Sequence, residues 1–259
     1  MRHAAALAAL MLASPAAAQD RGYCPSRPGL GTTPCTIAAG KLSLETGIAD
    51  WERDDRSDAR TDTITIAASE VRLGVSETSE VLVVWTPFAR ERVREAGSVR
   101  RREGIGDVTL GFKQNLARPD GGGFSWAVQP IVSLPVGRVG GGDWETGLLV
   151  PMSYDLSASI NLQVTPEIDA AADEDGRGRH LSFGTIAGVQ IKLSGTVDAI
   201  AEIEARANDD PARHERLASA ALSIAWAPAD DLQLDIGGVA GLSRDTPDAR
   251  IYAGVSRRF

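Results

Sequence analysis

The sequence predicts an all-β protein, a twelve-stranded antiparallel up-and-down transmembrane β-barrel. Three observations favour this fold class. Long segments alternate apolar and polar residues, tight connections alternate with longer polar ones, and the few aromatic residues gather at the segment ends. A bilayer selects all three features, because a tilted membrane strand needs about 10 residues and its aromatic residues lie at the two interfaces.

The alternation is clearest between residues 144 and 170. After Ser157 one parity is apolar and the other is polar or ionised: Ile160, Leu162, Val164, Pro166, Ile168 and Ala170 against Asn161, Gln163, Thr165, Glu167 and Asp169. The segment before Ser157 alternates in the same way from Trp144 to Tyr154. Because successive side chains of a strand point to opposite faces, the two segments predict a tight hairpin. Both exceed the roughly five or six residues of a typical strand in a soluble protein.

The pattern repeats from residue 41 to the end of the chain. We expect strands over residues 41–53, 61–76, 80–88, 106–117, 123–136, 143–156, 158–170, 180–193, 196–207, 213–227, 232–243 and 250–259. Tight connections (77–79, 118–122, 157, 194–195 and 228–231) alternate with longer ones (54–60, 89–105, 137–142, 171–179, 208–212 and 244–249). Outer-membrane barrels have an even strand number, short periplasmic turns and longer outer loops. Residues 41–259 are therefore predicted to form an outer-membrane barrel.

Aromatic residues make up 5% of the chain, and their placement agrees with two girdles at the membrane interfaces. We assign to the outer strand ends Trp51, Trp85, Phe88, Trp144, Phe183 and Tyr252, and to the periplasmic ends Phe124, Trp126, Tyr154, Trp226 and Phe259. The last segment places Ile251, Ala253 and Val255 on one face with the terminal Phe259. This end resembles the signal that such barrels present to the barrel-assembly machinery.

The N-terminus predicts export. Arg2 and His3 precede the apolar run 4–13, and Ala16-Ala17-Ala18 supplies a cleavage pattern, so residues 1–18 are predicted to be a signal peptide that is cleaved after Ala18. A buried Ala-rich helix is the alternative. Downstream, no apolar run approaches the roughly 18 residues of a transmembrane helix, so a chain that spans the membrane must do so as a closed barrel. The predicted location is the outer membrane, reached through the periplasm.

The only two cysteines, Cys24 and Cys35, lie in a stretch rich in proline and glycine. In an oxidising periplasm we expect them to pair. Free or metal-bound thiols are the alternative, although two thiols without a nearby histidine make a poor zinc site. Residues 19–40 are therefore predicted to be a disulfide-stapled segment at the periplasmic mouth, able either to cap the barrel or to fold into it.

Two stretches carry a family resemblance. Gly104-Ile105-Gly106-Asp107-Val108-Thr109-Leu110-Gly111-Phe112-Lys113 is followed by Gln129-Pro130-Ile131-Val132-Ser133-Leu134-Pro135-Val136-Gly137. Together they resemble the outer-membrane, transporter-like proteins of the meta-pathway phenol-degradation family, best over residues 80–156. The resemblance implies a barrel and passage of small organic compounds. It transfers no site residues.

The polar parity supplies the candidates for the lumen wall. They are Asp107, Lys113, Glu145, Asp155, Glu167, Asp169, Lys192, Asp198, Glu202, Glu204, Arg206 and Asp235. Because a confined passage amplifies such an acidic surplus, cations are expected to pass better than anions. The alternative is that the charges pair across strands. The formal net charge of −8 disfavours nucleic acid as a partner, because binding to nucleic acid depends on Lys and Arg.

Proline appears inside three consecutive predicted strands, at Pro130, Pro151 and Pro166. Proline cannot donate to a ladder and is normally confined to edges and bulges. The first interpretation is a set of bulges that bend the wall. The second is a weak seam through which an apolar solute leaves sideways into the membrane, because missing backbone bonds in lipid cost several kcal/mol each unless they are replaced.

The function that the sequence favours is a passive channel or transporter for small solutes, without a cofactor. A structural or adhesive surface barrel and a lipid hydrolase are the alternatives. His180 and Ser182 lie two residues apart on one strand face, but a nucleophile also needs a base in reach and a third group that orients it, and no such group is evident.

One loop suggests a lipid partner. Residues 90–103 contain an arginine cluster, defined here as Arg90, Arg92, Arg94, Arg100, Arg101 and Arg102. On the predicted topology this cluster faces outward, where lipopolysaccharide phosphates are available to guanidinium groups. A merely solvated loop is the alternative.

Overall fold

The structure is a computed structural model that describes residues 21–140 and 142–259. The predicted signal peptide, its cleavage site and Gln19 lie outside these residues. The strands are β1 (Leu42–Asp55), β2 (Ala59–Gly74), β3 (Ser79–Trp85), β4 (Phe88–Glu95), β5 (Ser98–Gly104), β6 (Val108–Ala117), β7 (Phe124–Leu134), β8 (Glu145–Leu149), β9 (Met152–Ser157), β10 (Ile160–Ala172), β11 (Arg179–Lys192), β12 (Val197–Asp209), β13 (His214–Ala229), β14 (Leu232–Gly241) and β15 (Ala249–Arg258). No helix in the described part of the chain is long and apolar enough to cross a membrane.

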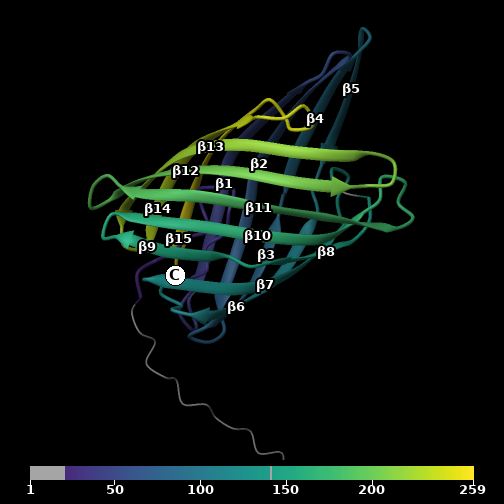
Figure 1. Cartoon of the computed structure of the whole chain (residues 1–259). Helices are drawn as coiled ribbons and strands as arrows, with labels where there is room; N and C mark the ends of the chain where they lie inside the picture. Colours follow the sequence, from purple (N-terminus) through teal and green to yellow (C-terminus); the bar gives the residue numbers. More distant parts are fainter. Residues whose placement is uncertain (1–20, 141) are drawn as a thin grey trace, which may run out of the picture.

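These segments form a closed antiparallel barrel (Figure 1). Strands that follow one another around the barrel are antiparallel, and β1 closes the ring by pairing with β15 from Ser43 opposite Arg258 to Arg53 opposite Ala249. Three barrel strands are interrupted once each, between β3 and β4, between β5 and β6, and between β8 and β9. Since the register against the neighbouring strands is the same on both sides of each break, the wall has twelve strands, as the sequence predicts.

The largest correction concerns residues 89–105, which were expected to form an outer loop. They form most of a hairpin of β4 and β5, which extends the barrel wall beyond the neighbouring strands (Figure 1). Its backbone is paired because β2 is long enough to continue alongside, from Ile66 opposite Phe88 to Ala59 opposite Glu95. The dense arginines concealed this extension, because they give the segment no apolar face.

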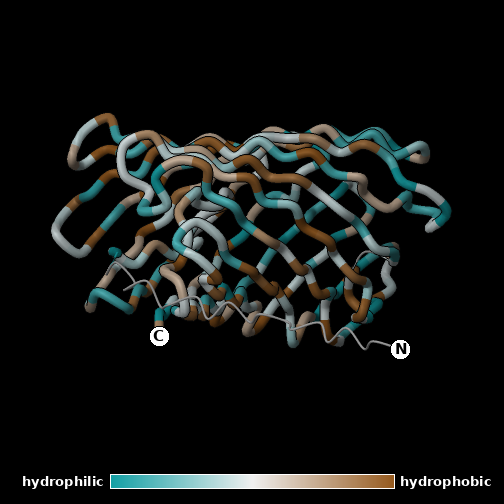
Figure 2. The backbone as a smooth tube through the Cα atoms, turned by 90° about the horizontal axis from the view of Figure 1, so that it is seen from below, coloured by the Kyte–Doolittle hydropathy of each residue, from teal (hydrophilic) through white to brown (hydrophobic). Residues whose placement is uncertain are grey.

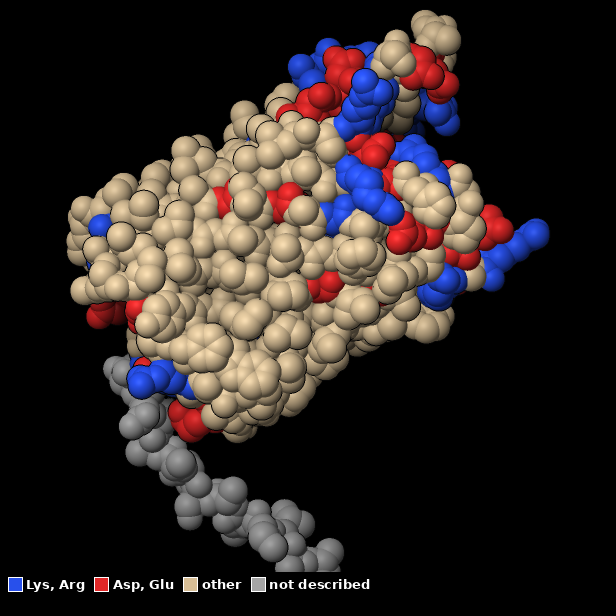
Figure 3. All heavy atoms as spheres, in the orientation of Figure 1, with Lys and Arg blue, Asp and Glu red and all other residues tan. Residues whose placement is uncertain are grey.

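The barrel is sided as the alternation requires. Large apolar side chains such as Leu148, Ile203 and Leu222 are exposed on the outer surface, whereas polar side chains such as Glu45 and Ser125 are buried inside. Figure 2 shows the resulting alternation along each strand, and Figure 3 shows a broad face with few charged atoms beside a charged end at β4 and β5. We call the end of the barrel with the long loops the loop end and the opposite end the turn end.

The aromatic girdles are present with one exception. Trp85 and Trp144 at the loop end, and Phe124 and Trp226 at the turn end, are 42–51% exposed on the outer surface. Tyr252 was assigned to the outer girdle, but it is 5% exposed and points inward. The reason is parity, since Tyr252 alternates with Ile251, which faces outward at 55% exposure.

Candidate functional site: a lumen crossed by the N-terminal segment

Residues 21–38, which we call the plug, lie inside the barrel. Near the turn end the backbone N–H groups of Ser26 and Arg27 donate to Glu45 of β1, at 3.0 and 2.9 Å. On the opposite wall the N–H groups of Leu30 and Gly31 donate to Glu202 of β12, at 2.8 and 3.0 Å. The plug therefore spans the lumen from wall to wall. The sequence left open whether this segment caps the barrel or folds into it, and the structure shows the described part, residues 21–38, folded into the barrel.

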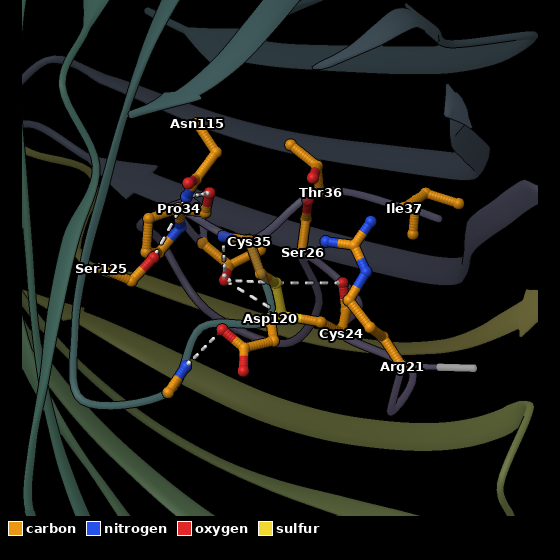
Figure 4. The surroundings of a disulfide bond; sticks show 12 residues. Arg21, Cys24, Ser26, Pro34, Cys35, Thr36, Ile37, Asn115, Asp120 and Ser125 are labelled. Carbon is orange, nitrogen blue, oxygen red and sulfur yellow. Dashed lines mark hydrogen bonds between the residues drawn. A yellow bond between two sulfur atoms is a disulfide. The ribbon is translucent and has the colours of Figure 1, made fainter. Parts of the chain in front are cut away.

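A disulfide joins Cys24 to Cys35 within the plug (Figure 4). Cys35 is completely buried, and the Thr33 hydroxyl lies 3.2 and 3.0 Å from the two sulfur atoms. Pro34, also fully buried, accepts a hydrogen bond from the Asn115 amide of β6 at 2.9 Å. The expected pairing of the cysteines is confirmed. The disulfide links the part of the plug that contacts several strands of the barrel wall.

A network of buried charges anchors the plug to β1, β2, β3 and β6. Arg72 donates to Glu45 at 3.0 Å and to Glu80 at 2.8 Å, and Lys113 lies 3.2 Å from Glu80. All four side chains are inaccessible to solvent. We call this set the charge network.

The charge network is bonded directly to the plug backbone. Arg72 donates to the carbonyl oxygens of Cys24 and Cys35, at 2.9 and 3.2 Å. Glu80 accepts from the N–H of Ile37 at 2.7 Å. Of the network, the sequence interpretation named only Lys113. The sequence held a signal for the other three members, because Glu45, Arg72 and Glu80 occupy the polar, inward-facing positions of their alternating strands.

Strands β10, β12 and β14 hold the plug by a second set of polar contacts. Arg27 forms a two-pronged ion pair with Asp235 of β14, with nitrogen–oxygen distances of 2.8 and 3.1 Å. The Thr165 hydroxyl of β10 donates to the carbonyl of Thr32 at 3.2 Å. Gly29 has φ +130°, and a Cβ there would come within 2.9 Å of a Glu202 oxygen. Glycine is therefore needed where the chain passes closest to this carboxylate.

Toward the loop end the lumen contains a cavity of about 300 Å³, lined in part by Glu145, Ser182 and Arg206. Arg206 pairs with Glu167 and, at 2.6 Å, with Asp169. Its Nε lies 3.8 Å from Glu204, which accepts from Ser219 at 3.0 Å. Three of the predicted lumen carboxylates thus meet one predicted lumen arginine.

At the turn end a second cavity, of about 210 Å³, is lined by Asp155, Lys192 and Asp198 together with Cys24 and Thr33 of the plug. Asp155 accepts from the N–H of Gly123 at 2.6 Å and from Asn161 at 2.7 Å. Asp198 accepts from Gln190 at 2.9 Å. The two cavities therefore lie toward opposite ends of the lumen.

Two other predicted lumen residues lie at particular contacts. Glu145 accepts from the N–H of Ala172 at 3.1 Å. Asp107 lies between β5 and β6, where its carboxylate packs against Gly140 so closely that a Cβ at that glycine would come within 2.1 Å of it. Asp107 therefore fixes the loop after β7.

The three prolines occupy adjacent barrel strands but not one seam. The Pro151 carbonyl accepts from Ala127 of β7 and the Pro166 carbonyl accepts from Val150, both at 2.9 Å. In an antiparallel ladder the N–H and the C=O of one residue point to the same neighbouring strand. The N–H that proline lacks would therefore point to the strand that its C=O contacts, which is β7 for Pro151 and the strand containing Val150 for Pro166. The register places Pro130 opposite Phe112, where the pairing of β6 with β7 is interrupted. The missing donors are therefore spread over three seams.

The bulge interpretation is wrong at Pro151. Both neighbouring strands keep the same register on either side of this residue, from β8 to β9, so no extra residue is inserted. A sideways exit through the wall stays a prediction.

His180 and Ser182 do not form a catalytic pair in the described structure. His180 contacts Asp173 and Asn208, at 3.0 and 2.6 Å, whereas Ser182 accepts from Arg206 at 3.2 Å. Ser182 is 4% exposed and lines the lumen cavity at the loop end. This geometry assigns the two residues to different clusters.

Four members of the arginine cluster line a hollow of about 560 Å³ at the loop end, beside Trp51, Arg53 and Asp62; they are Arg90, Arg92, Arg94 and Arg101. Asp62 accepts from Arg53 and Arg94, at 3.2 and 3.1 Å. The neighbouring charges of Arg94 and Arg101 lower the pKa of Arg92 from its usual value. Because several arginines and a single acidic residue, Asp62, line the hollow, it has more positive than negative charge.

Comparisons with known proteins agree with this architecture. Residues 25–259 match the family described as "Putative MetA-pathway of phenol degradation". No curated protein has significant sequence similarity to the chain. Among solved structures, an outer membrane channel from Pseudomonas putida F1 is similar over 90% of this chain and 100% of its own, with TM-score 0.70 and 12% identity. The NanC porin has TM-score 0.54 and 12% identity over 83% of this chain and 98% of its own. These likenesses concern the outer-membrane β-barrel fold.

Proposed function

The chain belongs to the MetA-pathway of phenol degradation family, and from that premise we propose that it is a passive outer-membrane channel for small solutes, including apolar or aromatic ones, narrowed by its own plug. The observation that carries the proposal is the way the plug is held. It contacts the walls through hydrogen bonds and ion pairs, with cavities toward both ends of the lumen. Polar contacts of this kind exchange with water far more readily than a packed apolar core does. A structural or adhesive barrel would need neither a plug held by polar contacts nor cavities at the two ends of the lumen.

The proposal is for transport without catalysis. The similar structures named above are a channel and a porin, and the geometry separates His180 from Ser182. A hydrolase would need its nucleophile and base within hydrogen-bond reach. His180 and Ser182, the pair that suggested lipid hydrolysis, hydrogen-bond to other residues and not to each other.

We also propose that the arginine cluster contacts lipopolysaccharide when the loop end faces outward. The support is the charge imbalance around the hollow and the projection of β4 and β5 beyond the wall (Figure 3). Planar guanidinium groups bind phosphate through paired hydrogen bonds. Such contacts would orient the barrel in the membrane and leave the lumen free.

The charge of the lumen predicts cation preference. Arg206 and Arg27 neutralise several carboxylates, but the turn-end cavity is lined by Asp120, Asp155 and Asp198 against the single cation Lys192. In planar bilayers with a tenfold KCl gradient, we expect a reversal potential of the sign for K⁺ preference. The Asp155→Asn/Asp198→Asn variant should shift it toward zero.

The matched control is Asp58→Asn, which removes a carboxylate from an exposed loop at the other end. It should leave the reversal potential unchanged. Anion preference in the unmodified protein would contradict the assignment of charge, and absence of any conductance would contradict the channel itself.

A further inference from the structure

Three side chains of metal-ligating type meet between two loops at the loop end. Asp173 follows β10, His180 lies at the start of β11, and Asp210 follows β12. The Nδ1 atom of His180 lies 3.0 Å from Asp173 Oδ1 and 3.4 Å from Asp210 Oδ2. The three ligand atoms all lie within 4.8 Å of one another. His180 and Asp210 are 9% and 5% exposed, so water does not separate the groups.

The hydrogen bonds of His180 fix the orientation of its ring. Its other ring nitrogen, Nε2, lies 2.6 Å from the Asn208 side-chain oxygen. The orientation of that amide is fixed because its nitrogen donates to Glu215 at 3.2 Å. Nε2 must therefore carry a proton and donate it. Nδ1 faces two carboxylate oxygens, an arrangement that suits either a proton on Nδ1 or a metal ion held between the ring and the carboxylates.

The carboxylate of Asp210 is held in place by the backbone. Its Oδ1 accepts from the N–H of Ala212 at 2.6 Å, and its Oδ2 accepts from the N–H of Glu174 at 2.8 Å. Glu174 belongs to the other loop, so this one carboxylate already connects the two. In the same way, the hydrogen bond from His180 to Asn208 holds the imidazole ring in place. Metal-ligating histidines commonly donate their second nitrogen to such a partner, which fixes the tautomer and the ring orientation.

We propose that Asp173, His180 and Asp210 bind a divalent transition-metal ion of the zinc type. A tetrahedral zinc ion holds nitrogen and oxygen ligands at about 2.0–2.2 Å, which places neighbouring ligand atoms about 3.3 Å apart, close to the two measured separations. One imidazole with two carboxylates suits zinc better than magnesium or calcium, which prefer oxygen ligands throughout.

The site has room for further ligands. A cavity of about 300 Å³ adjoins it, lined by His180, Asp210, Glu174 and Glu215. Water from that cavity would complete the coordination. The bound ion would tie the loop after β10 to the loop after β12 beside the lumen mouth, since Asn208 lies both here and on the loop-end lumen cavity.

The test is zinc binding by the full-length barrel in detergent, after treatment with a chelator, followed by isothermal titration with ZnCl₂ at neutral pH. We expect one ion per chain. His180→Ala should abolish binding, and Asn208→Ala, which removes the partner that orients the ring together with its bond to Glu215, should weaken it by about 10–100-fold. The matched control is His214→Ala, because His214 is 71% exposed and contacts only Asp209 among acidic groups.

Folding of each variant is checked by heat-modifiable migration on gels, and a second readout is hydrogen exchange over residues 173–180 and 210–213. Zinc should slow exchange in both loops of the unmodified protein and in neither loop of His180→Ala. The proposal would be overturned by the absence of stoichiometric binding, by binding that survives in His180→Ala, or by binding that is lost in His214→Ala. Absence of stoichiometric binding would mean that a proton on Nδ1 of His180, and not a metal ion, lies between the ring and the carboxylates.

Discussion

The Arg72→Ala variant is expected to lose about 3–5 kcal/mol of stability, the effect of removing one partner from a buried ion pair. Arg72 lies between Glu45 and Glu80, and all three side chains are inaccessible to solvent. Alanine would leave Glu45 without a charged partner and Glu80 with Lys113 alone. It would also remove the donors to two plug carbonyls, at Cys24 and Cys35. The loss therefore combines uncompensated charge with unpaired backbone groups.

The measurement is urea unfolding in detergent, followed by tryptophan fluorescence. The matched control is Arg100→Ala, since Arg100 is 71% exposed in its pair with Glu95 and an exposed pair contributes only about 0–1 kcal/mol. Arg72→Lys should lie between the two, because it keeps the charge but loses the planar fork. Equal midpoints for Arg72→Ala and Arg100→Ala would refute the role assigned to the charge network.

The second large effect concerns the attachment of the plug to β12 and β14. Glu202 accepts two backbone hydrogen bonds from the plug, and Asp235 pairs twice with Arg27. Hydrogen bonds to charged groups contribute about 1.5–3 kcal/mol each. Loss of only two such bonds would raise the population of detached plug about 100-fold. We expect at least that change in Glu202→Ala/Asp235→Ala, because on β10, β12 and β14 the plug would keep only the hydrogen bonds that its carbonyls accept from Thr165 and Gln233.

Hydrogen exchange over residues 24–36 measures this population, because detachment exposes the plug amides. The matched control is Glu204→Ala. Glu204 lies two residues from Glu202 on the same strand face, but it bonds to Ser219 of the wall and not to the plug. Exchange in the plug should accelerate in the double variant and stay unchanged in the control. Unchanged exchange in both would show that Glu202 and Asp235 do not hold the plug.

Much of the fold was readable from the sequence because a membrane barrel imposes its pattern on every strand. The alternation after Ser157 predicted β10 with its inward Glu167 and Asp169, and the order of short and long connections predicted the strand number. The β4–β5 hairpin was missed for the same physical reason. Outside the bilayer nothing requires an apolar face, so its arginines left no alternation to detect.

The interior was harder to predict, because parity tells which way a side chain points but not what it meets there. Lys113 and Asp235 were assigned to the lumen from parity, but their partners Glu80 and Arg27 lie about 30 and 200 residues away along the chain. The pair of Asp235 with Arg27 depends on entry of the plug into the barrel. Lys113 lies directly opposite Glu80 on the neighbouring strand, and the two meet only in the register that continues into the β4–β5 hairpin. The three-residue cluster at His180 likewise depends on two loops that only the fold brings together.

The central claim is that residues 21–38 occupy the lumen of a channel, and single-channel conductance tests it most directly. The unmodified protein is compared in planar bilayers with a variant that lacks residues 21–36, which keeps Ile37 and its bond to Glu80. Water can hydrate the charge network in the emptied lumen, so the deleted barrel should still fold and migrate in a heat-modifiable way. The account predicts a several-fold larger conductance for the deletion variant. Equal conductance in the two folded proteins would contradict it.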